Sequence, residues 1–259
     1  MQEQRIRRVL TIAGSDPSAG AGIQLDLKIF EKLGVYGTSV IASVTAQNTL
    51  GVQKVYKLPQ TIIAAQIDSV MRDIGTDACK IGMLLSHQAV ETVAERVHRR
   101  KIQNVVLDPV IAAKDGTTLL SATGVKRMKR FLIPRVLMVT PNVPEAEILS
   151  GVKIKSHADL KSAANAILDM GVPWVLVKGG HLEGTPVDTL FGEGLQAEFP
   201  GERIEGRPVH GTGCALSAAI AARIALGDDV PAASEFAKDF VAGLIKNAKK
   251  IGRGNLIIR

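Results

Sequence analysis

The sequence predicts an α/β protein whose central, mainly parallel sheet is covered by helices on both faces. Short strands that are apolar throughout alternate with helical stretches from one end of the chain to the other. Strands that are buried on both faces are typical of parallel sheets. The 259 residues contain no linker-like tract, low-complexity segment or obvious repeat. We therefore expect one domain over residues 1–259.

The first elements are predicted from apolar runs and from helical spacing. An apolar run over residues 9–13 predicts a buried strand, and a loop rich in Gly, Ser, Asp and Pro follows it. Ile23, Leu27 and Phe30 then recur at helical spacing, which predicts a helix that stops at Gly34. Two further strands are expected, over residues 38–45 and 52–58. The second has the alternating pattern of side chains that is typical of an edge strand.

The rest of the chain continues the alternation. Helices are predicted over residues 61–74, 86–100, 213–225 and 231–248, and the last of these is expected to complete the chain. Strands are predicted over residues 79–83, 105–107, 136–139 and 175–177, with a strand pair over 187–204. Ligands of such sheets bind at the carboxyl ends of the strands, so the polar turns there are candidates for one site.

Composition excludes several classes of protein. With 46% hydrophobic and 22% charged residues, the chain is not a disordered polymer. No apolar stretch approaches the ~20 residues of a membrane helix, and the charged N-terminus is unlike a signal peptide, so we expect no membrane partner. Two cysteines are too few for a disulfide framework, which favours a cytoplasmic protein.

The net charge of +7 is able to attract phosphate groups. The basic runs are short and far apart, and aromatic residues make up only 3% of the chain, so little is available to stack on bases. We therefore expect no nucleic-acid partner. Walker-type, zinc and His-Glu-x-x-His signatures are absent, and a dinucleotide fingerprint fails because Leu25 stands where a third glycine would be needed.

The most informative segment is His210-Gly211-Thr212-Gly213-Cys214, at the start of a helix of small residues. Free N–H groups and the helix dipole make such a start a binding site for a transferring phosphoryl group. The same field is expected to lower the pKa of the Cys214 thiol, so that a thiolate accepts a proton from a substrate hydroxyl. The alternative is a glycine turn followed by a small cysteine that packs in the core.

Asn142 and Glu145 lie three residues apart at another predicted helix start. An amide and a carboxylate so placed fit Mg²⁺ held through waters, since this ion takes few direct protein ligands. The alternative is structural, with Asn142 as the N-cap and Glu145 completing a capping box.

Lys178 follows an apolar strand and precedes Gly179 and Gly180, a position from which a lysine reaches a nucleotide phosphate. The alternative is a solvated loop lysine. The next residue, His181, is interpreted as a hydrogen-bonding loop residue.

Three further side chains are candidates for a substrate pocket. Gln47 follows a strand, where its amide is able to read the edge of a heterocycle through a donor and an acceptor. Met83 is a candidate for an apolar wall, with core packing as the alternative. Asp26 falls off the apolar stripe of its helix, so a surface aspartate is the alternative to a site residue.

These segments together resemble the ribokinase-like superfamily, and especially the hydroxymethylpyrimidine/phosphomethylpyrimidine kinases of thiamine biosynthesis. The matching segments come in the family's order and span nearly the whole chain. They are residues 11–16 (TIAGSD), 20–24, 26–28, 44–49 (VTAQNT), 80–84 (KIGML), 107–110 (LDPV), 140–142, 145–147, 177–181 (VKGGH) and 210–214 (HGTGC).

The resemblance implies a three-layer α/β/α fold and an ATP-dependent kinase. This enzyme would phosphorylate 4-amino-5-hydroxymethyl-2-methylpyrimidine and then its monophosphate, with Mg²⁺. It implies that Gln47 pairs with the pyrimidine ring, with Gly14, Asp26, the Thr45 backbone, Met83 and Val110 around it. It also implies an anion hole of Gly211, Thr212 and Gly213, contact of Lys178 with ATP, Mg²⁺ and phosphate organised by Asn142 and Glu145, and Cys214 facing the attacking hydroxyl.

Homodimers are common among similar proteins, which makes a homodimer the expectation here. Two other functions stay open. One is a pyridoxal or pyridoxine kinase, because some cysteine-bearing relatives act on that flat heterocycle. The other is a non-catalytic binder of phosphorylated metabolites or nucleic acid, which would bind without turning over ATP.

Overall fold

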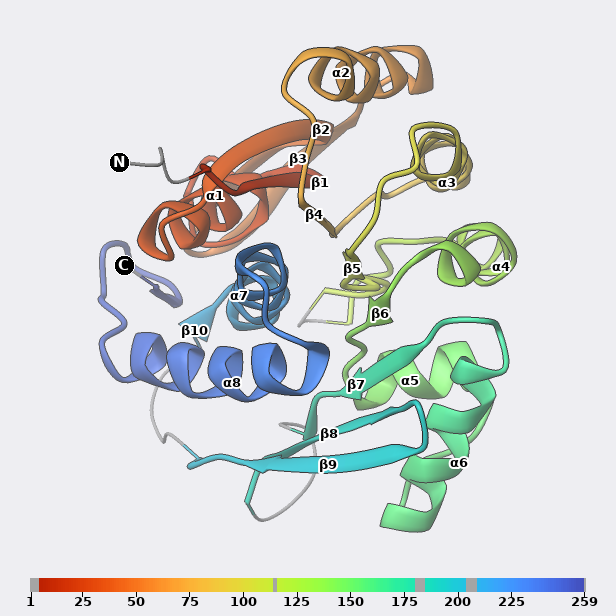
Figure 1. Ribbon diagram of the computed structural model, residues 1–259. Coiled ribbons are helices and arrows are strands. Elements are labelled where there is room, and N and C mark those ends of the chain that lie inside the picture. The colour runs from red at the N-terminus through yellow and green to blue at the C-terminus, as the bar shows by residue number, and fades with distance from the viewer. Residues whose placement is uncertain (1–4, 114–115, 180–184, 204–208, 259) are drawn as a thin grey trace.

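A nine-stranded sheet forms the centre of the fold (Figure 1). The computed structural model describes residues 5–113, 116–179, 185–203 and 209–258. The strands are β1 (Arg8–Ser15), β2 (Tyr36–Asn48), β3 (Gly51–Lys57), β4 (Ala78–Ile81), β5 (Val105–Leu107), β6 (Met138–Val139), β7 (Trp174–Val177), β8 (Val187–Gly192) and β9 (Leu195–Pro200), in the order β3-β2-β1-β4-β5-β6-β7-β8-β9.

The strands from β2 to β7 in that order run parallel, and the antiparallel pairs lie toward the two edges. The prediction of a mainly parallel sheet is confirmed. β1 pairs with β2 on one side and with β4 on the other. The chain therefore adds β2 and β3 on one side of β1 and continues with β4 on the opposite side. In open sheets such a switch point creates a crevice at the carboxyl ends of the strands.

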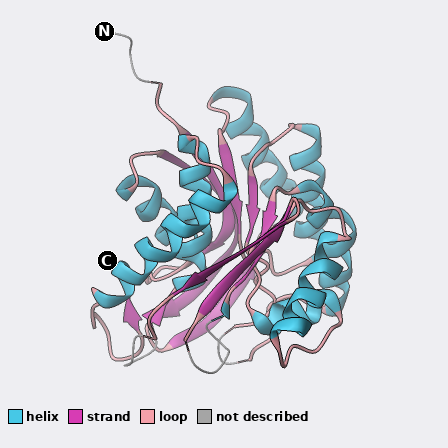
Figure 2. Ribbon diagram, turned by 60° about the horizontal axis from the view of Figure 1, so that its bottom comes forward, coloured by secondary structure: helices cyan, strands magenta, loops and turns pink. Residues whose placement is uncertain are grey.

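Helices cover both faces of the sheet, as the two views show (Figures 1 and 2). One layer contains α1 (Gly22–Lys32), α7 (Thr212–Leu226) and α8 (Val230–Lys246). The other contains α2 (Gln60–Asp73), α3 (His87–Arg99), α4 (Ala122–Arg127), the π-helical turn η1 (Met128–Leu132), the 3₁₀ turn η2 (Ile133–Arg135), α5 (Val143–Ser150) and α6 (His157–Leu168).

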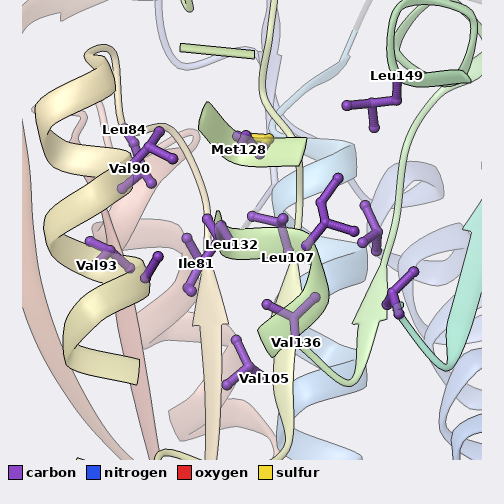
Figure 3. Packing of buried hydrophobic residues seen from close by; sticks show 14 of the residues in the cluster. Ile81, Leu84, Val90, Val93, Val105, Leu107, Met128, Leu132, Val136 and Leu149 are labelled. Atoms are coloured by element: carbon purple, nitrogen blue, oxygen red, sulfur yellow. The ribbon is translucent and has the colours of Figure 1, made fainter. Parts of the chain in front are cut away.

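Successive strand residues pack against opposite helix layers. Val105 and Leu107 of β5 belong to the core beneath α2–α6, whereas Val106 between them packs on the α7 side. Figure 3 shows Ile81, Leu107 and Val90 in the first of these cores. Because both faces are buried, the strands are apolar throughout, which is the pattern that the sequence displays.

Side-chain caps fix where several helices begin. Ser86 accepts a hydrogen bond from the Ala89 N–H at the start of α3, as its sequence position predicts. Ser121, Ser156 and Asp229 do the same for α4, α6 and α8. Within the described part of the chain, no helix is long and apolar enough to cross a membrane.

Two predictions about local structure were wrong in detail. The buried face of α1 contains Leu25 and Asp26 beside Ile23, Ile29 and Phe30, whereas Leu27 is partly exposed. The face is wide because α7 and β2 both pack against this helix as well as β1. The strand expected to reach residue 83 ends at Ile81, although the Gly82 N–H still donates to the Ile12 carbonyl of β1.

The chain does not end with the predicted final helix. After α8 it returns as β11 (Leu256–Ile257), which pairs in parallel with β10 (Val209–His210). The backbone N–H groups of Gly254 and Asn255 donate to the Oγ1 and carbonyl oxygen of Thr49. Two-residue strands carry no periodicity, and their partners are far away in the sequence, so the pattern could not predict this return.

Candidate active site

The predicted site residues converge at the carboxyl ends of the parallel strands and at the start of α7. Hydrogen bonds between neighbouring strand ends tie these turns together. The Asp108 N–H donates to the Ile81 carbonyl at 2.8 Å, and the Lys178 N–H donates to the Pro141 carbonyl at 2.8 Å. The carboxyl ends of these strands therefore gather turns from different parts of the chain.

The start of α7 depends on glycine. Gly211 is the N-cap, with φ +82°, and a Cβ at this position would lie 1.9 Å from the carbonyl oxygen of Gly20. Gly211 has no side chain that would cap the helix, so its first N–H groups stay available to an anion. The predicted anion-binding turn of Gly211, Thr212 and Gly213 thus has the backbone geometry that the chemistry needs.

Lys178 lies directly against this turn. Its Nζ would be 3.2 Å from a Cβ on Gly213, and it donates to Asp108 Oδ1 at 2.8 Å. Although burial lowers the pKa of Lys178, the carboxylates of Asp108 and Glu145 raise it above its usual value. The ammonium is therefore fixed as a positive charge beside the anion-binding turn.

Asn142 and Glu145 form the capping box of α5. Asn142 Oδ1 accepts from the Glu145 N–H, and Glu145 Oε2 accepts from the Asn142 N–H, each at 2.9 Å. Burial and the nearby Asp108 raise the pKa of Glu145 to about 7, although Lys178 opposes the shift. The structural alternative for this pair is confirmed, and it leaves a buried carboxylate facing Lys178.

The carboxylates fit a magnesium ion that is held mainly by phosphates. The described residues include no cluster of three or more His, Cys, Asp or Glu side chains that would enclose a metal. Asp108 and Glu145 supply two buried carboxylates near the anion-binding turn, 3% and 5% exposed. Mg²⁺ in such sites takes one or two carboxylates together with waters and substrate phosphates, so this donor set is adequate.

Gly14 and Met83 face each other at the ends of β1 and β4. A Cβ on Gly14 would lie 2.4 Å from Met83 Cε and 2.8 Å from Ser43 Oγ. Met83 is only partly buried and lies outside both hydrophobic cores, as does Val110 after β5. The structure therefore brings Gly14 and Met83 together, in keeping with a pocket wall rather than core packing.

Asp26 is not a surface residue, and that alternative was wrong. Its side chain is fully buried, with Oδ2 accepting from Lys80 Nζ at 2.8 Å and from Thr11 Oγ1 at 2.6 Å. Among the described residues, Oδ1 has no hydrogen-bond partner. Burial raises the pKa of Asp26 despite the opposing charge of Lys80. The aspartate faces the sheet because α1 buries a wider face than the apolar stripe indicated.

The expected lowering of the Cys214 pKa was also wrong. Cys214 is a free thiol in the first turn of α7, where burial raises its pKa, helped by Asp108 and Asp26. The Lys80 charge and a hydrogen bond from the Gly22 N–H act in the opposite direction. Desolvation is the largest contribution to the pKa of Cys214, and it outweighs these opposing effects.

Gln47 and Thr45 extend from the end of β2 toward β1 and β10. Thr45 Oγ1 donates to the Ser15 carbonyl at 2.9 Å and lies 3.3 Å from Gln47 Oε1. Gln47 Nε2 lies 2.9 Å from Nε2 of His210. Gln47 is partly buried, so its amide is held by the protein at one end of the crevice.

Four residues around the site were not predicted: Asp16, Lys80, Asp108 and His210. Each stands inside a segment that the family resemblance covers, but no role was assigned to it. Lys80 had the clearest signal, a lysine inside an otherwise apolar strand. Gly180 and His181 lie outside the described residues.

Comparison with known proteins identifies the family. The family described as phosphomethylpyrimidine kinase matches residues 16–259. The chain belongs to this family. It is 43% identical over 252 residues to the hydroxymethylpyrimidine/phosphomethylpyrimidine kinase of Bacillus subtilis (strain 168), covering 96% of this chain and 93% of the relative.

Solved structures agree with this phosphomethylpyrimidine kinase family and with the predicted ribokinase-like fold class. The phosphomethylpyrimidine kinase from Clostridium difficile 630 is similar at a TM-score of 0.83 and 40% identity, over 92% of this chain and 99% of that one. An ADP complex of Bacillus subtilis pyridoxal kinase is similar at a TM-score of 0.92 and 33% identity, over 98% and 97% of the two chains.

Proposed function

We propose that this kinase transfers the γ-phosphoryl group of ATP to 4-amino-5-hydroxymethyl-2-methylpyrimidine and then to its monophosphate, as a step of thiamine biosynthesis. Membership of the phosphomethylpyrimidine kinase family carries the proposal. The convergence of Lys178, Cys214 and the glycine turn supports the same chemistry, since it brings a cation, a proton acceptor and an anion-binding helix start together.

On the substrate side, Gln47 pairs with the aminopyrimidine ring through its amide. Gly14, the Thr45 backbone, Met83 and Val110 surround the ring, and the close approach of Gly14 to Met83 supports this arrangement. Asp26 acts from behind the pocket, since its side chain is fully buried against Lys80. It holds the charge of Lys80 beneath the site.

On the nucleotide side, Lys178 contacts the phosphates of ATP, and the N–H groups of Gly211, Thr212 and Gly213 receive the transferring phosphoryl group. These groups stabilise the charge that spreads over the phosphoryl oxygens in the transition state. Glu145 and Asn142, with Asp108 nearby, would hold Mg²⁺ through waters and phosphates. When bound, this ion neutralises charge on the phosphates.

Cys214 faces the attacking hydroxyl. As the hydroxyl oxygen forms its bond to the γ-phosphorus, its proton passes to the Cys214 sulfur, and the bond from that phosphorus to the bridging oxygen of ADP breaks. Burial and two carboxylates raise the pKa of the thiol, whereas the positive charge of Lys80 opposes them and favours the thiolate that accepts this proton. Positioning and charge stabilisation supply most of the catalysis, as in other phosphoryl transfers.

The whole chain, residues 1–259, acts as one kinase domain in this proposal, supported by the continuous nine-stranded sheet. We place the enzyme in the cytoplasm as a homodimer. Cys79 and Cys214 are both free thiols, in keeping with a reducing compartment.

Pyridoxal phosphorylation is the second candidate function, because the fold is so similar to that of a pyridoxal kinase. Release of ADP from Mg-ATP, measured with the pyrimidine, its monophosphate and pyridoxal in parallel, separates the two. Turnover of both pyrimidines with little turnover of pyridoxal supports the main proposal. A preference for pyridoxal would replace it with a role in vitamin B6 salvage.

A further inference from the structure

The imidazole of His210 joins two side chains that come from distant parts of the chain. His210 Nε2 lies 3.2 Å from Asp16 Oδ2 and 2.9 Å from the amide of Gln47. The ring is held in place, because a Cβ on Gly20 would lie 2.8 Å from His210 Cδ2. One ring nitrogen therefore serves two partners at once.

Asp16 decides the role of that nitrogen. Its Oδ1 accepts from the Ser18 N–H and hydroxyl, and its Oδ2 accepts from the Ala21 N–H. These three donors stabilise the ionised carboxylate without any contribution from His210. An ionised carboxylate only accepts hydrogen bonds, so His210 Nε2 must carry a proton.

The proton on His210 in turn fixes the amide of Gln47. The two ends of a carboxamide are assigned by their hydrogen-bond partners. An amide nitrogen 2.9 Å from a protonated Nε2 would set a donor against a donor. With the amide turned by 180°, the Gln47 oxygen accepts from His210 instead.

Thr45 requires the same orientation. Its hydroxyl has one hydrogen, which it donates to the Ser15 carbonyl at 2.9 Å. The atom of Gln47 that lies 3.3 Å from Thr45 Oγ1 must then be a donor, which is the amide nitrogen in the turned orientation. Asp16, His210 and Thr45 thus all favour one arrangement of a single amide.

We propose that His210, backed by Asp16, is a positioning residue that locks the Gln47 amide with its oxygen toward His210 and its nitrogen toward Thr45. The amide has two oxygen lone pairs and two N–H groups, so one acceptor and one donor remain for the substrate, in a fixed order. This inference rests on the proposed function, in which Gln47 pairs with the pyrimidine ring.

The fixed order determines which ring the site accepts. A 4-aminopyrimidine presents an N–H donor beside a ring-nitrogen acceptor, whereas the corresponding pyrimidin-4-one presents a carbonyl acceptor beside an N–H donor. A Gln47 amide that is free to turn would serve both rings. A locked amide pairs with the amino compound and leaves polar groups unpaired against the pyrimidinone.

The protonation state of His210 is measured without any substrate. In the full-length ¹⁵N-labelled protein near pH 8, long-range ¹H–¹⁵N spectra, assigned with His210→Leu, should show a protonated Nε2. A neutral His210 with a bare Nε2 would overturn the proposal, whatever the enzyme's substrate.

Selectivity is the second readout. We expect His210→Leu to lower the ratio of kcat/KM for the 4-amino substrate over the pyrimidinone by at least about ten-fold, with the KM for ATP within about two-fold. Asp16→Asn should lower the ratio too, because its amide can donate to Nε2. Asp16→Asn also provides this test if His210→Leu does not fold. His98→Leu, on the exposed face of α3, is the control and should leave the ratio unchanged.

The Gln47→Ala background separates positioning from a structural role. When His210→Leu is added to Gln47→Ala, the ratio should not change further, because the amide that His210 positions is no longer present. Equal losses of kcat/KM for both compounds in His210→Leu and Asp16→Asn, with the ratio unchanged, would overturn the proposal. Absence of wild-type turnover of the 4-amino substrate would instead refute the proposed function, and the NMR result would then decide the inference.

Discussion

Lys80 Nζ lies 2.8 Å from Asp26 Oδ2, and neither side chain has any exposed surface. The pair joins β4 to α1 next to the candidate active site. The ammonium is also near Gly82, where a Cβ would lie 2.9 Å from Nζ. A buried charge pair of this kind is strongly coupled, because the loss of one partner leaves the other charge without compensation.

Removal of one member of this pair is therefore expected to destabilise the protein. Lys80→Met should lower the free energy of unfolding by about 3–5 kcal/mol, whereas Lys80→Met combined with Asp26→Leu should lower it much less. Urea unfolding measures both. The control is Lys153→Met, which breaks an exposed pair with Glu147 and should change the free energy of unfolding far less. A loss in the double variant equal to the sum of the losses in Lys80→Met and Asp26→Leu would show that the charges are not coupled.

Cys214→Ala tests the proton acceptor. Turnover should fall by about 10²–10⁴-fold, the usual contribution of a general base, with little change in the KM values of ATP and pyrimidine. Cys79→Ala is the matched control, since that thiol is buried in β4 within the core. It should lose some stability but keep its kcat. A wild-type kcat in Cys214→Ala would exclude the thiol as the base.

Gln47→Ala tests recognition of the ring. Loss of the amide should weaken pyrimidine binding by about 1–3 kcal/mol, because polar atoms of the substrate then lack partners. Calorimetric titration with the pyrimidine measures this change. Gln53→Ala, in the exposed strand β3, is the control and should bind as the wild type does. Unchanged affinity in Gln47→Ala would mean that another group reads the ring.

Asp77 is expected to account for part of the loss of folding stability at acid pH. Its Oδ2 accepts from the backbone N–H of Arg8 at 2.8 Å, and hydrogen bonds and charge from Arg8 hold its pKa below the usual 3.8 although burial opposes this. A lowered pKa stabilises the folded state above pH 3.8, and this contribution disappears as the pH falls through the folded-state pKa.

Asp77→Asn should therefore cost about 1 kcal/mol near neutral pH, the usual value of such hydrogen bonds, and progressively less below about pH 4. Unfolding by urea at several pH values gives the difference between variant and wild type. A difference that stayed constant between pH 6 and pH 3 would contradict this assignment.

Much of the fold was predictable from the sequence because its signals are local. The apolar run of β5 matched the prediction to the residue, and Ser86 marked the start of α3. What could not be predicted depends on distant partners. β11 consists of two residues whose strand partner lies more than forty positions earlier, and no pattern within so short a segment identifies that partner.

The features of the candidate site likewise fall into those that local patterns predict and those that depend on distant residues. The glycine turn before Cys214 and the capping box of Asn142 and Glu145 are local patterns, and the structure contains both. The direction of the Cys214 pKa shift depends instead on burial and on charges from β4, from α1 and from the turn after β5. Likewise, the contact of His210 with Asp16 joins positions 194 residues apart, which periodicity does not reveal.

The order in which phosphorylated products form distinguishes phosphorylation of the pyrimidine from phosphorylation of pyridoxal. The enzyme is incubated with 4-amino-5-hydroxymethyl-2-methylpyrimidine and excess Mg-ATP, and the pyrimidine products are followed by ³¹P NMR. The monophosphate should appear first and then decline as the diphosphate accumulates, with one ADP formed for each phosphoryl group transferred. If no phosphorylated pyrimidine forms while pyridoxal is phosphorylated under the same conditions, the chain does not carry out the proposed reaction.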